Sequence, residues 1–182
     1  FRSEHTNEAI LDRIVKINVP YILELNQEIK IYEKLLSRSD FDAHIAPHTI
    51  KIASMFSILS RLKGSQKCDL MTKLKIYNGD DVIEKGRVKK IDIKDLRDEA
   101  HEEGMTGIST RFIMKGIDNA LSDSEKNMIT PNTIIEALIR QVKEQVVDEE
   151  DKNTYLELLQ SLIREEYLKI LENEIAKAFI VT

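Results

Sequence analysis

The sequence predicts a mainly α-helical protein with a short N-terminal strand and an inserted two-stranded β-ribbon. Apolar residues recur at three- and four-residue spacings along most of the chain, which is the period of an amphipathic helix. Aromatic residues make up only 5% of the 182 residues, and Trp is absent. This composition favours helices packed through Leu and Ile over an aromatic-rich β-sandwich. The length suits one ordinary domain or two small ones.

The N-terminal part predicts a strand followed by two helices. Ile14–Val19 is rich in β-branched residues and ends at Pro20, so we expect a buried strand whose sheet lies upstream of Phe1. Because the chain begins with Phe1 rather than Met, we also expect it to be a piece of a longer protein. One helical face follows, and a second helix starts near Pro47. Their apolar stripes are Leu25, Ile29, Tyr32 and Leu36, then Ile52, Met55, Phe56, Leu59 and Leu62.

The middle of the chain predicts the inserted ribbon, over residues 70–93. Lys73–Tyr77 alternates between polar and apolar residues, Asn78-Gly79 is typical of a turn, and Val88–Ile93 alternates again. The connection between the two alternating segments is too long for a two-residue hairpin loop, so the sequence leaves the pairing register open.

Three helices complete the predicted fold. Ser109 is a suitable N-cap for a helix that follows a loop with two glycines, and Thr130-Pro131 resembles an N-cap with a first-turn proline. The acidic run Asp148–Asp151 suits the positive end of a last helix over residues 151–178. This helix has apolar residues on more than one face, so we expect it to pack against two neighbours or another chain.

Charge and cysteine content exclude several classes of function. Lys and Arg total 27 against 32 Asp and Glu, a net charge of −5, which argues against non-specific binding to nucleic acid or anionic membranes. The single Cys68 excludes an intrachain disulfide framework and a multi-cysteine zinc site. No apolar run approaches the roughly 20 residues that a membrane-spanning helix needs. We expect a soluble, cytoplasmic protein.

The catalytic motifs that are easiest to recognise are missing. The sequence contains no phosphate-binding P-loop, no protein-kinase HRD or DFG motif, no zinc-protease HExxH and no GxSxG nucleophile elbow. His44 and His48 have helical spacing, but Pro47 between them disfavours a regular metal-binding face. We predict no metal site.

Two arginines are the candidate functional residues. Arg13 directly precedes the predicted strand, and Arg111 stands in the first turn of the helix after the glycine loop. A guanidinium is permanently charged and forked, which suits phosphate oxygens at an interface or beside a lid. The alternative is ordinary ion pairing with the many nearby carboxylates, and spacing alone favours this alternative.

Segments around both arginines resemble the PrkA family of bacterial serine protein kinases. The resemblance covers essentially the whole chain, and the string Glu103–Phe112 carries most of its specificity. The other segments are His5–Ile14, Val19–Tyr21 and Asp42–Thr49.

The resemblance implies a place within an AAA+ protein. Family members have an AAA+ ATPase domain, with its P-loop and Walker B motif, followed by a C-terminal region described as the kinase domain. It implies that residues 1–20 end the AAA+ core, that residues 21–122 form a helical lid with the ribbon, and that residues 123–182 are C-terminal helices. By resemblance, Arg13 is an arginine finger that acts in trans, and Arg111 is a nucleotide-binding sensor-2 arginine.

The same resemblance implies the ligands and partners. ATP and Mg belong to the full-length parent, with none expected in the fragment, which is inactive alone because its P-loop is absent. The partners are ATP, a protein serine substrate and further copies in a homo-oligomer, with no nucleic acid and no membrane. Stress response and sporulation are the implied settings.

Two alternatives stay open because nothing after Arg111 supplies a recognisable kinase metal-binding pair. The chain would then be a helical protein-interaction module, with the ribbon and the last helix as docking surfaces. Otherwise it would belong to an AAA+ ATPase that remodels or degrades proteins rather than phosphorylating them.

Overall fold

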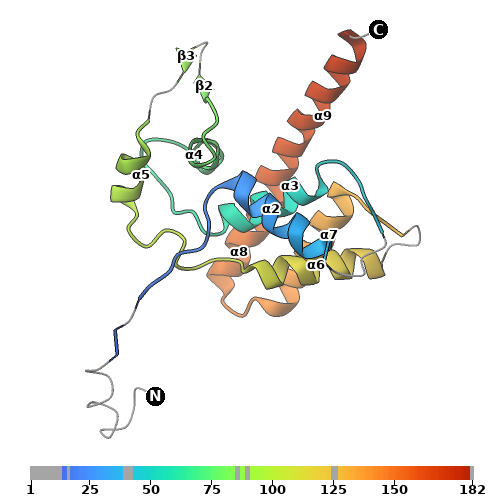
Figure 1. Cartoon of the computed structure of the whole chain (residues 1–182), viewed down its shortest axis with the longest axis horizontal. Coiled ribbons are helices and arrows are strands. Elements are labelled where there is room, and N and C mark those ends of the chain that lie inside the picture. The colour runs from blue at the N-terminus through green and yellow to red at the C-terminus, as the bar shows by residue number, and fades with distance from the viewer. Residues whose placement is uncertain are drawn as a thin grey trace, which may run out of the picture.

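The computed structural model describes residues 14–15, 17–38, 43–84, 87–88, 91–123 and 127–180. Helices dominate these residues, which confirms the predicted mainly α fold (Figure 1). The elements in chain order are α2 (Leu25–Leu36), β1 (His44–Ile45), α3 (Thr49–Leu59), α4 (Leu70–Tyr77), β2 (Ile83–Glu84), β3 (Arg87–Val88), α5 (Ile93–Glu99), α6 (Thr110–Ser122), β4 (Met128–Ile129), α7 (Pro131–Gln145), α8 (Glu149–Glu157), the π-helical turn η2 (Leu158–Leu162) and α9 (Ile163–Ile180).

Helix α3 forms the centre of the molecule. Every side chain from Ile52 to Leu59 is buried, because α2, α6, α7 and the η2–α9 segment all contact this helix. The apolar stripes predicted for α2 and α3 therefore lie in the core, although Ile29 is only half-buried. Helix α3 begins at Thr49, close to the predicted start near Pro47, and His48 is its N-cap residue with a left-handed φ of 67°.

The predicted caps Ser109 and Thr130 are confirmed, and Asp148 proves to be a third cap. The Ser109 side chain accepts a hydrogen bond from the Phe112 backbone N–H at the start of α6. Thr130 caps α7 in a reciprocal arrangement with Thr133, and Asp148 accepts two backbone N–H groups at the start of α8. Each cap satisfies donors that the first helical turn leaves without a partner.

The predicted ribbon is wrong over its first half. Residues 70–77 form helix α4, and among the described residues of this region the antiparallel ribbon is made of β2 and β3, with Ile83 opposite Val88. Asp69 caps α4 by accepting the Thr72 N–H, and Leu74 and Tyr77 reach the core at helical spacing. The pattern of this short segment fits both the two-residue period of a strand and the period of a helix, and burial of one helical face decides for the helix.

The predicted N-terminal strand is also absent among its described residues, 14–15 and 17–19. They form no regular structure and are exposed, with Val19 81% accessible, and neither sheet of the described residues pairs with them. A parallel pairing of β1 with β4, which places His44 beside Met128 and Ile45 beside Ile129, was not predicted. Two-residue strands are too short to leave a periodic signal in the sequence.

The last helical segment differs from a single continuous helix. The π-helical turn η2 separates α8 from α9 and shifts the direction in which the following side chains point. Leu158, Leu159 and Ile163 are buried against α3 and α7, which accounts for part of the two-faced pattern. The second half of α9 extends away from the other helices (Figure 1) and exposes Ile175 and Phe179. None of the described helices is long and apolar enough to cross a bilayer.

Candidate functional site

Arg111 is the second residue of α6, and its side chain is exposed. It makes no hydrogen bond or ion pair with the part of the chain that the structure describes, and the first turn of α6 contains no acidic residue. The partial positive charge of a helix N-terminus makes this an unfavourable position for a cation unless an anion is near. Ion pairing with neighbouring carboxylates, the alternative interpretation of Arg111, is therefore not observed among these residues.

Arg13, the other candidate, lies outside the described residues. The structure does not test its arginine-finger role or its distance from Arg111.

His44 is exposed and His48 is the αL residue before α3, in line with surface and cap positions. Within the described ranges, no group of three or more His, Cys, Asp or Glu side chains is placed to hold a metal ion.

The loop before α6 is packed tightly against the end of α3. Gly107 has a φ of +113°, and a Cβ added there would lie only 2.6 Å from the Ser60 carbonyl oxygen, so glycine is required. The next residue, Ile108, donates its backbone N–H to Ser60 Oγ at 2.9 Å. The position of Arg111 is thus set by a loop with little freedom to move.

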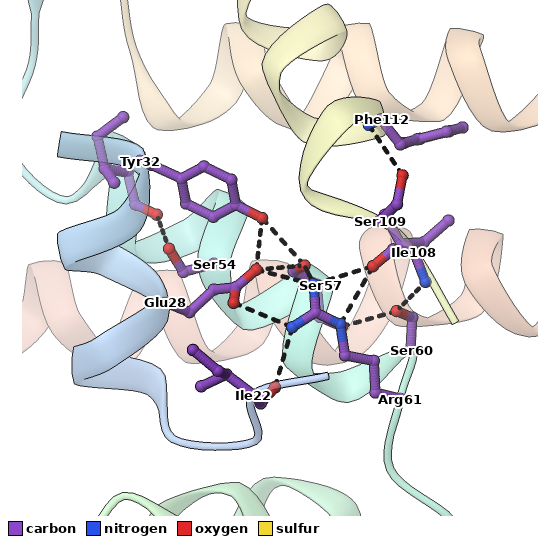
Figure 2. A network of polar contacts seen from close by, with 11 residues as sticks. Ile22, Glu28, Tyr32, Ser54, Ser57, Ser60, Arg61, Ile108, Ser109 and Phe112 are labelled. Carbon is purple, nitrogen blue, oxygen red and sulfur yellow. Dashed lines mark hydrogen bonds and ion pairs between the residues drawn. The ribbon is translucent and has the colours of Figure 1, made fainter. Parts of the chain in front are cut away.

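Arg61, just beyond the end of α3, holds this loop from a fully buried position. Figure 2 shows the guanidinium at the centre of a polar cluster of side chains and carbonyl groups. Nε and Nη2 donate to the Ile108 carbonyl at 3.1 and 3.0 Å, and Nη1 donates to the Ile22 carbonyl at 2.9 Å. The guanidinium also lies 4.6 Å from the centre of the Tyr21 ring, a cation–π distance.

Glu28 of α2 neutralises Arg61 through a two-pronged ion pair. Nη1 donates to Oε2 at 3.0 Å and Nη2 to Oε1 at 2.8 Å, and Ser57 and Tyr32 donate to the same Oε1 (Figure 2). Burial alone raises the pKa of Glu28, but the hydrogen bonds from Arg61, Tyr32 and Ser57 outweigh it and hold the pKa below its ordinary value. Burial and the Glu28 charge raise the pKa of Tyr32, so its hydroxyl remains a donor.

A second buried ion pair contacts Lys63, two residues after Arg61. Lys73 of α4 pairs with Glu103 and also donates to the Lys63 carbonyl at 2.9 Å. Glu103 accepts the Tyr77 hydroxyl at 2.6 Å and the Lys63 backbone N–H at 2.8 Å. Burial, followed by the hydrogen bond to Glu103, raises the pKa of Tyr77. This pair fixes the start of the glycine loop to α4.

A cavity of about 480 Å³ lies between the segment that enters α2 and the loop that follows α5. Glu24, Arg97 and Glu103 bring charge to its lining, and Tyr21 and Tyr77 bring aromatic surface. Arg111 does not line this cavity, so the cavity is not a preformed pocket around the candidate residue.

Sequence reasoning missed Glu28 and Arg61. One signal was present: Glu28 falls on the apolar stripe of α2, between Leu25 and Tyr32, where an acidic residue requires a buried partner. Nothing in the local pattern identifies that partner, because Arg61 follows Glu28 by 33 residues.

Comparison with known proteins places both parts of the chain. Residues 1–69 match the family model of the PrkA AAA domain, and residues 71–182 match that of the PrkA serine protein kinase C-terminal domain. The two matches meet at the start of α4. Both buried ion pairs make contacts across this junction, because Arg61 donates to Ile108 and Lys63 contacts Lys73 and Glu103. The predicted domain limits at residues 20 and 122 stay predictions.

Two curated relatives align with 99% of the chain. The "ATP-dependent protease PrkA" of Bacillus subtilis (strain 168) is 38% identical over 188 residues, and the "Serine/threonine kinase YeaG" of Escherichia coli (strain K12) is 35% identical over 183 residues. The chain spans only 28% of the length of each relative. No solved structure matches the chain. Because the C-terminal model alone matches more than half of the residues, this chain belongs to the PrkA family.

Proposed function

We propose that this chain is the regulatory lid and C-terminal part of a larger PrkA-family protein with an AAA+ ATPase core. The two family matches, which meet near residue 70, are the observation that carries the proposal. In the proposed full-length protein, ATP and Mg bind to the upstream core, and copies associate into a homo-oligomer in the cytoplasm. The fragment is inactive on its own because its sequence contains no P-loop.

Arg111 is the proposed nucleotide-sensing residue, comparable to a sensor-2 arginine. Its exposed guanidinium and the N-terminal end of α6 both present positive charge, an arrangement that suits the phosphate groups of a bound nucleotide. Arg13 is proposed as an arginine finger that reaches the nucleotide of a neighbouring subunit. In both roles the fixed charge stabilises the developing negative charge during phosphoryl transfer.

Substitution of Arg111 in the full-length protein tests this role. We expect Arg111→Ala to weaken ATP binding roughly 10- to 100-fold, because it removes one charge-assisted hydrogen bond. Calorimetry with ATP measures the affinity, and phosphate release measures hydrolysis. Arg164→Ala is the matched control, since Arg164 is also an exposed arginine near the start of a helix. Unchanged affinity and hydrolysis in Arg111→Ala would contradict the proposal.

The reaction that the ATPase serves has two candidates. Phosphorylation of protein serine is the first, and the names of the C-terminal family model and of the E. coli relative support it. Degradation or remodelling of proteins is the second, and the printed name of the B. subtilis relative favours it.

One experiment separates these two reactions. The full-length protein is incubated with γ-labelled ATP and casein, and both label transfer and casein cleavage are followed. Label on serine without cleavage supports the kinase, whereas ATP-dependent cleavage without label supports the protease. The isolated chain, as the control, should show neither reaction.

A further inference from the structure

We infer that Arg61 is a positioning residue for Arg111, because it fixes the loop from which α6 begins to α3 and to the segment that leads into α2. The inference rests on the nucleotide-sensing role proposed for Arg111 and identifies what holds that residue in place. Arg61 lies in the part that matches the AAA domain, whereas Arg111 lies in the part that matches the C-terminal domain.

The contacts of Arg61 connect three separate segments. Its guanidinium donates to the carbonyl of Ile22 before α2, to the carbonyl of Ile108 before α6, and to the carboxylate of Glu28 within α2. A fully buried cation is costly unless all of these acceptors remain in place. Moving either loop away from Arg61 is therefore unfavourable, so the two loops are expected to move together.

Residue 60 supports the same loop beside Arg61. Ser60 Oγ accepts the N–H of Ile108, while Arg61 donates to the carbonyl of Ile108, so neighbouring residues hold both backbone polar groups of one residue. Gly107 rests against Ser60 and Arg61 at distances that exclude a side chain. Ser109 then caps α6, which leaves only one residue between the cap and Arg111.

Arginine suits this position better than lysine. The planar fork contacts two carbonyls and both carboxylate oxygens at once, whereas an ammonium is a compact charge that reaches fewer acceptors in fixed directions. Arg61→Lys keeps the charge but is expected to lose the simultaneous hold on Ile22 and Ile108. It therefore separates the positioning role from the mere presence of a buried cation.

A double-mutant cycle in the full-length protein tests the inference. Ser60→Ala and Arg61→Lys are each combined with Arg111→Ala, and ATP affinity is measured by calorimetry. We expect each single change to weaken ATP binding about three- to tenfold, the effect of one lost hydrogen bond. In the Arg111→Ala background the same changes should have almost no further effect, because they act through Arg111. Ser60→Ala removes a single hydroxyl, which keeps the test valid if Arg61→Lys does not fold.

Gly79→Ala supplies the matched control. Gly79 also has a positive φ, +80°, but an added Cβ would meet nothing within 4 Å, so the substitution strains the backbone without touching the loop before α6. Hydrogen exchange over residues 107–112 gives an independent measurement, and we expect faster exchange in Ser60→Ala than in Gly79→Ala.

The possible results lead to different conclusions. Loss of ATP affinity in Arg111→Ala with no change in Ser60→Ala and Arg61→Lys would overturn the positioning role of Arg61 alone. So would effects that add fully to that of Arg111→Ala, or an equal loss of affinity in Gly79→Ala. If Arg111→Ala itself left ATP binding and hydrolysis unchanged, the proposed function of Arg111 would fail, and the inference with it.

Discussion

The two buried ion pairs, Glu28–Arg61 and Lys73–Glu103, flank one short stretch of chain but differ in what they connect. Arg61 makes hydrogen bonds to two stretches that are distant in sequence, residues 22–28 and Ile108, and Glu28 accepts from three side chains. Lys73 donates to the Lys63 carbonyl and to Glu103, and Glu103 also accepts the Lys63 N–H and the Tyr77 hydroxyl. The first pair joins the end of α3 to the α2 region and to the loop before α6, mainly through its cation, whereas the second joins α4, Lys63 and the start of that loop, mainly through its carboxylate.

The difference follows from the chemistry of the two cations. A guanidinium offers five donors in a rigid fork, so one buried arginine can join several loops, while an ammonium offers three donors from a single point. Among the described residues, every buried side-chain nitrogen and oxygen in either group has a partner. The two pairs therefore predict different sensitivities to substitution.

The largest effect is expected from Arg61→Met, which leaves the Glu28 carboxylate buried without its cation. Breaking a buried ion pair from one side costs about 3–5 kcal/mol of unfolding free energy. Urea denaturation measures the change, and the double variant Glu28→Met with Arg61→Met should recover part of the loss. A loss below about 1 kcal/mol would mean that Arg61 does not join the segments as described.

Lys73→Met should cost less, roughly 2 kcal/mol, because removing the ammonium takes the donor from one backbone carbonyl, whereas removing the guanidinium takes it from two. The same urea titration compares the two variants directly. Lys67→Met, which breaks the exposed pair with Asp95, is the control and should change stability by less than about 1 kcal/mol. If Lys73→Met proved as damaging as Arg61→Met, the number of acceptors held by each cation would not explain the stability of the fold.

The smallest effect is the pH dependence contributed by Glu28. Its pKa is held below the ordinary value of 4.5, so the unfolded chain binds more protons than the folded chain in this range. Stability from this group is fully present above about pH 4.5 and is lost as the pH falls through the lowered pKa. Urea titrations between pH 3 and 6 measure the unfolding free energy, which should fall less steeply with decreasing pH in Glu28→Gln than in the unchanged protein. An identical pH dependence of the unfolding free energy in both proteins would contradict this.

Periodicity and local chemistry were sufficient for most helices of the fold. The stripes of α2 and α3 and the caps at Ser109, Thr130 and Asp148 depend on residues a few positions apart, so they are readable from the sequence. The same approach failed at residues 70–77, where a short pattern fits both a helix and a strand. It failed again at residues 14–19, where the partners of a strand are not part of the described chain.

The sequence by itself also determined the family and singled out Arg111 as a candidate. It could not show that Arg111 is free of ion pairs among the described residues, or that Arg61 and Ser60 hold the loop before it. These contacts join residues 47 or 48 positions apart, and no local rule relates such distant positions. Only tertiary packing brought Glu28, Arg61 and Ile108 together, because a buried charge is stable only where the whole fold supplies its partners.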